Sequence, residues 1–575
     1  MAILSSIFHS KKLLLFLNIS FLFLLSLFLK TSIFPHQSIQ LNSLPRQKFV
    51  ADGCTGLHDY SDYQSKCTYV KSQVGCEPKG YINYLRIFYC TCGEFPFLGY
   101  ALLLLWLLVL FYLMGDTAAN YFCSSLETLS RILRLPPTIA GITLLSLGNG
   151  ASDVFASIVS FTRSNDGDVG FNSILGGAFF ISSVVVGVIS ILTNSQEISV
   201  DKPSFIRDAL FFLSTLLALV LIILIGKISF LGAILFVSIY FIYISAVSGS
   251  YFYQKSKESK NMTLYDVPRS EDDFLERGIP LLGYVDEEKP ILMEIKTSSL
   301  ENHHHQEQNS SFSDYIHKLL NVLELPLYLP RRLTIPVVSE EKWSKTYAVI
   351  SATLAPLLLA AIYNTQREKN TGSRVSLVTF MAGGVIAVIL GNLAYVTTKN
   401  SGPPKTSLFP WVAGGFLMSV TWTYITAEEL VSLLVSIGNI VGISPSVLGL
   451  TVLAWGNSLG DLISNVAMAM NGGADGAQIA ISGCYAGPMF NTLVGLGMSL
   501  VFSSYSEYPS AYQIPEDPSL YETVAFLIGG LLWALVILPR KNMKLDRLLG
   551  CGLLAIYSCF LFLRFARAIG LLKLH

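Results

Sequence analysis

Residues 147–153 read Leu-Gly-Asn-Gly-Ala-Ser-Asp, and residues 455–461, at an offset of 308 positions, read Trp-Gly-Asn-Ser-Leu-Gly-Asp. The two stretches belong to one motif that is written twice without a gap. Each copy places one carboxylate in an otherwise apolar stretch, where a charge is costly unless it faces a cavity or a partner. Such duplicated segments predict one ion site built between two repeats of a membrane protein. The identical pairs at this offset are Pro137/Pro445, Gly141/Gly449, Thr143/Thr451, Leu145/Leu453, Gly148/Gly456, Asn149/Asn457 and Asp153/Asp461.

The composition supports a membrane protein. Of the 575 residues, 52% are hydrophobic and only 14% are charged, whereas a soluble chain carries roughly 25% charged residues. The net charge of zero gives nucleic-acid binding no electrostatic support. About thirteen apolar runs are long enough to cross ~30 Å of hydrocarbon as helices, and they do not fit the ~10-residue alternating segments of a β-barrel. These runs are 13–34, 96–115, 136–162, 169–193, 207–226, 229–251, 346–364, 375–397, 409–437, 444–470, 475–502, 520–538 and 547–569.

Cysteine usage and charge predict how the chain is placed across the membrane. Lys11 and Lys12 precede the first apolar run, as in a signal peptide or a signal anchor. Either reading puts residues 35–95 in the lumen or outside the cell. Five cysteines crowd this segment, which favours disulfides over a zinc site, with one thiol left free or paired elsewhere. They are Cys54, Cys67, Cys76, Cys90 and Cys92.

The basic residues of the loops agree with this orientation. Loops predicted to be cytosolic hold Lys202 and Arg207, or Arg540 and Lys541, whereas the outside loop 503–519 has no Lys or Arg. We predict six segments. They are a signal peptide or anchor (1–34), a Cys-rich outside segment (35–95), a first repeat (96–251), a disordered cytosolic loop (252–345), two extra transmembrane helices (346–397) and a second repeat (398–575).

The two repeats are predicted to have opposite orientations. Five helices precede the cytosolic loop, and the motif lies in the second of them. Two extra helices and then five more follow the loop, again with the motif in the second of the five. An odd number of helices per repeat inverts the second copy, so the two motif helices should meet near the bilayer midplane. The predicted fold is an all-α membrane protein with about ten core helices in two inverted five-helix repeats.

The motif residues are suited to binding a hard cation. Asn149 and Asp153 are four positions apart and share one helix face, and Asn457 and Asp461 do the same. The glycines beside them are expected to loosen the helix and free backbone carbonyls as ligands. Together with Ser458, these groups could form an all-oxygen shell for Ca²⁺ or Na⁺. Two aspartates give a charge that one divalent or two monovalent ions would balance, which is a basis for exchange.

The helix after each motif offers further positions. Gly487 and Asn491 are four apart, and Asn491 can add an amide oxygen. Phe180, its counterpart in the first repeat, cannot. Gly176 and Gly177 could serve the site or could instead allow close helix packing.

At this point the sequence resembles a known family. Residues 147–157, Leu-Gly-Asn-Gly-Ala-Ser-Asp-Val-Phe-Ala-Ser, resemble the first α-repeat of the sodium/calcium exchanger superfamily, and residues 456–461 resemble the second. The Asn-rich form is similar to the cation/calcium exchanger branch. The segment starting Cys54-Thr-Gly, the thirteen apolar runs and the large central loop are similar to the plant members.

The resemblance implies a set of cation ligands and some departures from it. Ser152 stands where the family has Pro, Asn491 where exchangers of the main branch carry a carboxylate, and Phe180 where they have a polar residue. Fewer negative ligands are compatible with the K⁺ and Na⁺ transport described for the branch. The residues implied to hold the cations are Asn149, Gly150, Asp153, Asn457, Ser458, Asp461, Gly487 and Asn491, with Gly176 and Phe180 at the matching positions of the first repeat.

The predicted function is secondary active antiport, without an enzymatic activity or a cofactor. It would exchange Ca²⁺ or monovalent cations (K⁺, Na⁺) against Na⁺, K⁺ or H⁺ by alternating access. The expected partners are inorganic cations and the lipids of the plasma membrane or an endomembrane (vacuole or endoplasmic reticulum), and not nucleic acid. One alternative is an intramembrane aspartyl protease, but no Tyr directly precedes Asp153, Ser458 replaces the first Gly of the Gly-x-Gly-Asp motif of that class before Asp461, and no Pro-Ala-Leu occurs. A second is a passive channel, against which the matched Asn/Asp pairs argue.

Overall fold

Helices dominate the structure, which is a computed structural model. It describes residues 16–22, 24, 54, 56–73, 76, 80–133, 143, 146–164, 167–194, 198–262, 325–338, 343–367, 373–400, 402–404, 408–471, 473–514 and 517–568. Within these ranges, eleven helices are long and apolar enough to cross a membrane. Each coincides with one predicted apolar run, and the other two runs, 13–34 and 136–162, lie partly outside the described residues. The predicted all-α membrane fold is confirmed.

The two repeats consist of matching series of helices. The first contains α5 (Pro96–Thr117), the π-helix η4 (Ala118–Cys123), α6 (Ser124–Leu133), α8 (Ser146–Val159), η6 (Ser160–Ser164), α9 (Gly167–Phe179), η7 (Phe180–Val185), α10 (Val186–Leu192), α11 (Lys202–Ile225) and α12 (Phe230–Met262). The second contains α18 (Leu408–Val441), α19 (Pro445–Leu448), η9 (Gly449–Leu453), α20 (Ala454–Asn471), α21 (Gly473–Phe490), η10 (Asn491–Leu496), α22 (Gly497–Ser506), α23 (Pro518–Arg540) and α24 (Arg547–Ala568).

A shared irregularity relates the helices that follow the two motifs. Helix α9 passes into the π-helix η7 at Phe180, and α21 passes into the π-helix η10 at Asn491. Both π-helical segments are six residues long. Because both π-helices begin at the two positions that the sequence pairs, Phe180 and Asn491, the helices that follow the two motifs are structural equivalents.

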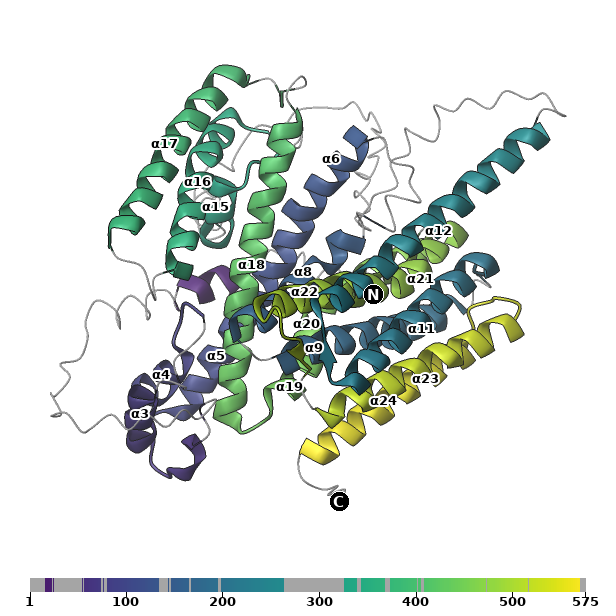
Figure 1. Ribbon diagram of the computed structural model, residues 1–575, viewed down its shortest axis with the longest axis horizontal. Coiled ribbons are helices and arrows are strands. Elements are labelled where there is room, and N and C mark those ends of the chain that lie inside the picture. Colours follow the sequence, from purple (N-terminus) through teal and green to yellow (C-terminus); the bar gives the residue numbers. More distant parts are fainter. Residues whose placement is uncertain are drawn as a thin grey trace, which may run out of the picture.

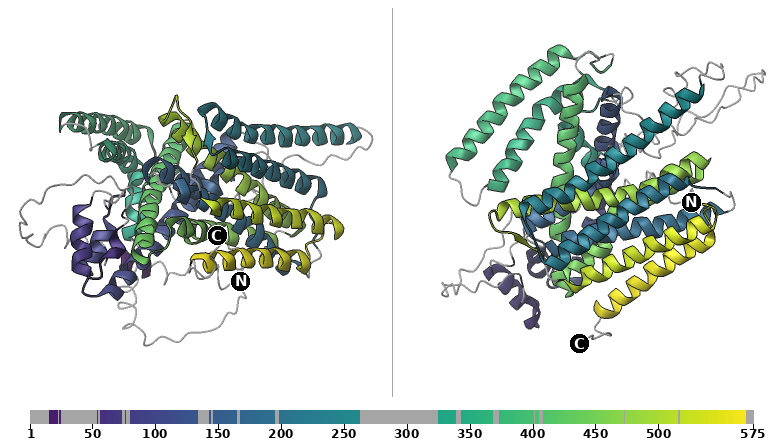
Figure 2. Two further views of the ribbon diagram at one scale, coloured as in Figure 1. Left: turned by 60° about the horizontal axis from the view of Figure 1, so that its bottom comes forward. Right: turned by 45° about the vertical axis from the view of Figure 1, so that its right-hand side comes forward.

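Helices from both repeats form one packed body. Helices α23 and α24 lie side by side at one edge, and the extra helices α16 (Lys345–Arg367) and α17 (Ser373–Thr397) form a pair at the opposite edge, beyond α18 (Figures 1 and 2). The motif helices α8 and α20 lie between these edges (Figure 1). Many apolar side chains on α17 are exposed, as expected for a helix that faces lipid.

Loops predicted to lie on the same side of the membrane meet in the structure. Strand β1 (Lys227–Ile228) lies at the opposite end of α11 from Lys202, which is predicted to be cytosolic, and it pairs with β2 (Tyr512–Gln513) in the predicted outside loop 503–519. At the other ends of these helices, Ser199 pairs with Lys544, and both belong to loops predicted to be cytosolic. The pairing therefore sorts the connecting loops into two groups, as the charge pattern requires.

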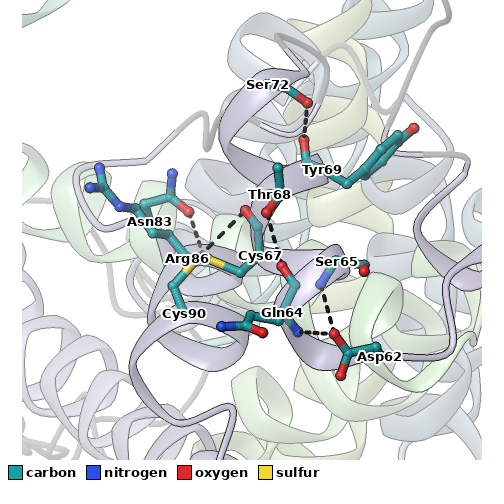
Figure 3. Close-up of a disulfide and its surroundings, with 10 residues drawn as sticks. All are labelled: Asp62, Gln64, Ser65, Cys67, Thr68, Tyr69, Ser72, Asn83, Arg86 and Cys90. Atoms are coloured by element: carbon teal, nitrogen blue, oxygen red, sulfur yellow. Dashed lines mark hydrogen bonds between the residues drawn. A yellow bond between two sulfur atoms is a disulfide. The ribbon is translucent and has the colours of Figure 1, made fainter. Parts of the chain in front are cut away.

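The Cys-rich segment folds into short helices held by two disulfides. Cys54 bonds to Cys76 and Cys67 bonds to Cys90, while Cys92 is a buried free thiol. The segment contains η1 (Leu57–Asp59), α3 (Tyr63–Ser72), α4 (Tyr84–Arg86) and η3 (Ile87–Thr91). The Asp62 side chain accepts hydrogen bonds from the backbone at the start of α3, and Cys67 joins this helix to Cys90 in η3 (Figure 3).

The Cys-rich segment is anchored to both repeats through Tyr84. Its hydroxyl donates to Glu429 of α18 and accepts a 2.8 Å hydrogen bond from the indole of Trp106 in α5. Glu429 also accepts from the backbone N–H of Tyr81. Tyr84 is therefore a buried polar link between the first helix of each repeat.

We expect the disulfides to stabilise this segment. The Cys67–Cys90 bond joins residues 23 positions apart, and a closed loop of that size contributes about 3 kcal/mol to the free energy of unfolding. Cys67→Ser should therefore lower the thermal midpoint of the purified protein, as should a thiol reductant. Cys551→Ser, which removes an exposed free thiol, is the control and should leave the midpoint unchanged.

The prediction that residues 252–345 form a disordered loop is wrong at both ends of this range. Helix α12 continues to Met262, and a further helix, α15 (Leu325–Thr334), lies inside the range. Helix α15 is ordered because it buries Leu327 and Arg331 against its neighbours. Residues 263–324 lie outside the described part of the chain. The division of the sequence into six segments otherwise stays a prediction.

Candidate functional site

The two motif helices bring their aspartates into the interior of the protein. Asp153 lies on α8 with 1% of its surface exposed, and Asp461 lies on α20 with 8% exposed. Helices α8 and α20 pack against each other. Asp153 and Asp461 therefore lie inside the protein and not on separate surfaces. An ion site between the repeats requires this arrangement.

Asp153 is held by amides of the opposite repeat. The Nδ2 group of Asn457 on α20 donates to Asp153 Oδ1 at 2.9 Å. The Nδ2 group of Asn491, the first residue of η10, donates to Asp153 Oδ2 at 2.8 Å. Two residues that the sequence singled out in the second repeat thus converge on the carboxylate of the first.

Three buried oxygen atoms around Asp153 have no hydrogen-bond partner among the residues that the structure describes. They are Asn457 Oδ1, Asn491 Oδ1 and Ser458 Oγ. Because an unpaired buried oxygen is costly, most such atoms in proteins find a donor, a water or an ion. A methyl group at Gly177 would lie 3.4 Å from Ser458 Oγ and 3.6 Å from Asp153 Oδ2. Ser458 therefore faces the same space as Asp153.

Asp461 has a different environment. Its backbone carbonyl accepts a 2.9 Å hydrogen bond from Asn465 Nδ2, one turn later on α20. Helix α21, which buries Cys484, packs against α20. One difference between the two aspartates follows from the sequence, because Phe180 occupies the position that matches Asn491 and has no amide to offer.

The expectation that the motif glycines unwind their helices is wrong. Both α8 and α20 are continuous α-helices through the motif. The glycines instead allow close approach of other elements. A methyl group at Gly150 would lie 2.0 Å from Asn491 Oδ1, and one at Gly148 would lie 2.8 Å from Cys123 Sγ. The absence of side chains lets η10 and η4 pack directly on α8.

The remaining predicted positions differ in their relation to the site. A methyl group at Gly176 would lie 2.4 Å from the carbonyl oxygen of Leu450, so this glycine serves helix packing. Gly177, one residue later, is the one that faces Asp153. A methyl group at Gly487 would contact nothing within 4 Å. Asn149 lies on α8, but its side chain is outside the described part of the structure.

Buried acids outside the motif were not predicted from the sequence. Asp208 on α11 accepts from Arg207 Nε at 2.9 Å and from the Tyr243 hydroxyl at 3.0 Å. Glu428 and Glu429 on α18 are also buried, and Glu429 anchors the Cys-rich segment. A scan for every acid within an apolar run would have found all three.

The atoms that can serve as cation ligands at the site are carboxylate, amide and hydroxyl oxygens. Within the described residues, no group of three or more His, Cys, Asp or Glu side chains is placed to hold a metal ion. Oxygen donors of low total charge suit hard cations such as Na⁺, K⁺ and Ca²⁺. The set is therefore suited to binding a cation reversibly.

The chain is similar in sequence to proteins of a known family. The sequence model of the "Sodium/calcium exchanger protein" family matches residues 103–249 and 411–566. The chain is 54% identical to cation/calcium exchanger 1 of Arabidopsis thaliana over 99% of its own length and 98% of that protein. It is 46% identical to cation/calcium exchanger 2 of the same plant, over 90% and 91% of the two chains. Among solved structures, an H⁺/Ca²⁺ exchanger (CAX) aligns with 80% of this chain and 82% of its own at 13% identity and a TM-score of 0.42. The chain belongs to the sodium/calcium exchanger family, in the cation/calcium exchanger branch.

Proposed function

We propose that the protein is a secondary active antiporter that exchanges cations through the site between α8 and α20. The observation that carries this proposal is the convergence of Asn457 and Asn491 on the buried Asp153 carboxylate. The relatives that the chain resembles over nearly its whole length are named cation/calcium exchangers. Asp153, Asp461, Asn457, Ser458 and Asn491 are proposed to bind the transported ions.

The charge of the site explains why transport would be an exchange. With Asp153 and Asp461 ionised, the empty site carries two negative charges in a region of low dielectric. One divalent cation, or two monovalent cations or protons, would neutralise it. A loaded site can be moved across the membrane at much lower cost than an empty one, so one load is released only when another can replace it.

The ligand set favours binding of both monovalent and divalent cations. Ca²⁺ sites commonly contain several carboxylates, and selectivity follows ligand charge and number. This site offers two carboxylates and two amides, with Asn491 in place of a third acid. We propose that it accepts K⁺ and Na⁺ as well as Ca²⁺, with Na⁺, K⁺ or H⁺ as the counter-ion.

The passive-channel alternative is disfavoured by burial. Asp153 is almost completely enclosed, and both of its oxygens are hydrogen-bonded across the repeats. A channel would need a continuous wet path past this group, whereas an exchanger needs a closed site that opens to each side in turn.

Transport by purified protein in liposomes tests the proposal. Uptake of ⁴⁵Ca²⁺, ⁸⁶Rb⁺ and ²²Na⁺ is measured with imposed Na⁺, K⁺ or pH gradients. An exchanger takes up the labelled ion only when a counter-ion leaves, and uptake stops when the internal counter-ion is omitted. Uptake that is independent of any counter-ion would contradict antiport, and no uptake of any of the three ions would contradict cation transport.

A pair of glycine variants tests the geometry of the site. Gly150→Ala places a methyl group 2.0 Å from the present position of Asn491 Oδ1 and must displace that amide from Asp153. We expect it to lower counter-ion-dependent uptake by about tenfold or more, as for the loss of a buried hydrogen bond to a charged group. Gly529→Ala on α23 makes the same change away from the site, meets nothing within 4 Å and is the matched control. Equal uptake by the two variants would contradict a role of Asn491 at the site.

A further inference from the structure

A line of buried serines leads from Asp153 toward the loop between α22 and α23, which is predicted to lie outside. Ser157 lies one turn after Asp153 on α8 and is completely buried. Ser499 and Ser503 lie one turn apart on α22 and are also buried. Helix α22 packs on both α8 and η6 and leads into the outside loop. We call Ser157, Ser499 and Ser503 the outer serine group.

One hydrogen bond joins two members of this group across the interface between the helices. Ser157 Oγ and Ser499 Oγ lie 3.0 Å apart, and both are buried. A hydroxyl has a single proton, and that of Ser499 is donated to the carbonyl of Gly495 at 2.9 Å. Ser157 is therefore the donor to Ser499. The bond ties the first repeat to the second one turn beyond the ion site.

The third member of the group has an unused hydroxyl. Ser503 Oγ is buried and has no hydrogen-bond partner among the residues that the structure describes. Because Ser503 follows Ser499 by four positions, it lies on the same face of α22 as the contact with α8. The neighbouring Ser504, by contrast, donates to the carbonyl of Leu500 within α22 at 2.6 Å. A buried hydroxyl without such a bond is expected to meet a water or an ion.

The inverted repeat places a different residue on the opposite side of the site. At the offset of 308 positions, Asn465 is the counterpart of Ser157. With inverted repeats, the chain runs outward after Asp153 and toward the cytosol after Asp461. Asn465 donates to the carbonyl of Asp461 in its own helix, and its Oδ1 would lie 3.3 Å from a methyl group at Gly483. The inner residue thus bonds within its repeat, whereas Ser157 bonds across the repeats.

We propose that the outer serine group lines the route between Asp153 and the outside, and that the bond from Ser157 to Ser499 closes this route in the described structure. Opening breaks this bond and turns the hydroxyl oxygens of the group toward water and the passing cation, for which they are suitable ligands. Serines also join membrane helices that never separate, so movement must be tested as well as contact. This proposal rests on the proposed exchange function.

A cross-link tests whether the two helices separate during transport. Cysteines at both positions, Ser157→Cys with Ser499→Cys, should form a disulfide when a mild oxidant is added, because the two hydroxyl oxygens are in contact. We expect oxidation to lower counter-ion-dependent uptake at least tenfold and a thiol reductant to restore it. Wild type and each single-cysteine variant receive the same treatments as controls. A double variant that forms the disulfide, as shown by its mass, and still exchanges at its reduced rate would overturn the proposal.

Accessibility at position 503 gives a second measurement that needs no cross-link. Ser503→Cys is treated in sealed vesicles with a membrane-impermeant thiol reagent on the side of the Cys-rich segment. The exposed Cys551 and Cys559 are replaced by serine in all variants. Ser504→Cys is the matched control, because Ser504 is equally buried but its hydroxyl is used within α22. We expect labelling at position 503 and none at position 504.

Loss of the closing bond should increase this labelling. Ser157→Ala removes the donor to Ser499, so we expect it to speed labelling at position 503 by about three- to tenfold, the factor by which loss of one hydrogen bond shifts a conformational equilibrium. Equal labelling of positions 503 and 504, or an unchanged rate with Ser157→Ala, would contradict the proposed route.

Failure of this proposal and failure of the proposed function give different results. If wild type exchanges cations and the cross-linked double variant does so equally well, the exchange function stands and the outer serine group is a packing contact. If wild type shows no exchange, the proposed function is contradicted, while labelling at position 503 still reports whether the route opens.

Discussion

Asp153→Asn should abolish counter-ion-dependent uptake of every cation while leaving the protein inserted and folded. The carboxylate is the group on which Asn457 and Asn491 converge. Its replacement by an amide removes one of the two negative charges that balance the transported load. With only one negative charge left, a bound divalent ion would give the site a net positive charge, which is unfavourable in a region of low dielectric.

The effect on stability distinguishes a binding role from a structural one. The amide that replaces the Asp153 carboxylate in the variant can accept a hydrogen bond from only one of the two Nδ2 groups, unless the amide of Asn457 or Asn491 rotates. The lost hydrogen bond costs about 1 kcal/mol. Against this, the variant no longer buries an ionised group, and burial of a charge is strongly unfavourable. We therefore expect a thermal midpoint close to that of wild type.

Controls make this first result specific. Asp461→Asn should lose uptake in the same way, because it removes the other charge of the same site. Asp546→Asn makes the identical substitution in the loop before α24, where the carboxylate lies 3.2 Å from Lys541 Nζ, and should transport normally. Gradient-driven uptake by both Asp153→Asn and Asp461→Asn would contradict the site, and unfolding of Asp153→Asn would assign the aspartate a structural role instead.

The sequence indicated which residues the two motif helices bring together, because the two repeats are written in the same register. An offset of 308 positions pairs Asp153 with Asp461, and a four-residue spacing places each asparagine on the face of its aspartate. These are properties of single helices, which local sequence determines. The partner of each group across the interface is not local. The structure pairs Asp153 with amides of the second repeat, and spacing within one motif carries no information about that choice.

Two other features escaped prediction for related reasons. Helix α15 is a short segment within a long polar range, so the average composition of residues 252–345 conceals it. Its order depends on the burial of Arg331 beside Asp116, a contact over 215 positions. The link between Tyr84 and Glu429 likewise joins residues 345 positions apart. Such polar contacts have no periodic signature in the sequence.

Asn491→Asp should convert the site into one that depends on a divalent cation. Asn491 Nδ2 lies 2.8 Å from Asp153 Oδ2, so the variant places two carboxylates at about hydrogen-bonding distance. Two ionised carboxylates cannot share such a position without a proton or a cation between them. We expect the ratio of ⁴⁵Ca²⁺ to ⁸⁶Rb⁺ uptake to rise by about tenfold, which corresponds to about 1.4 kcal/mol of added preference.

Stability measurements give this second prediction an independent readout. Without divalent ions, the repulsion between the two carboxylates should lower the thermal midpoint of Asn491→Asp below that of wild type. Ca²⁺ should then raise the midpoint of the variant more than that of wild type, because a ligand stabilises the folded state in proportion to how tightly it binds there.

The matched control for this variant is Asn491→Leu, which has a similar shape but neither an amide nor a charge. It loses the hydrogen bond to Asp153 and so should transport poorly, and Ca²⁺ should not raise its thermal midpoint beyond the wild-type response. If Asn491→Leu showed the same rise in Ca²⁺ preference as Asn491→Asp, the loss of the amide would be the cause. If neither variant changed the ratio, position 491 would not contact the transported ion, and the amide would serve only to hold Asp153 in place.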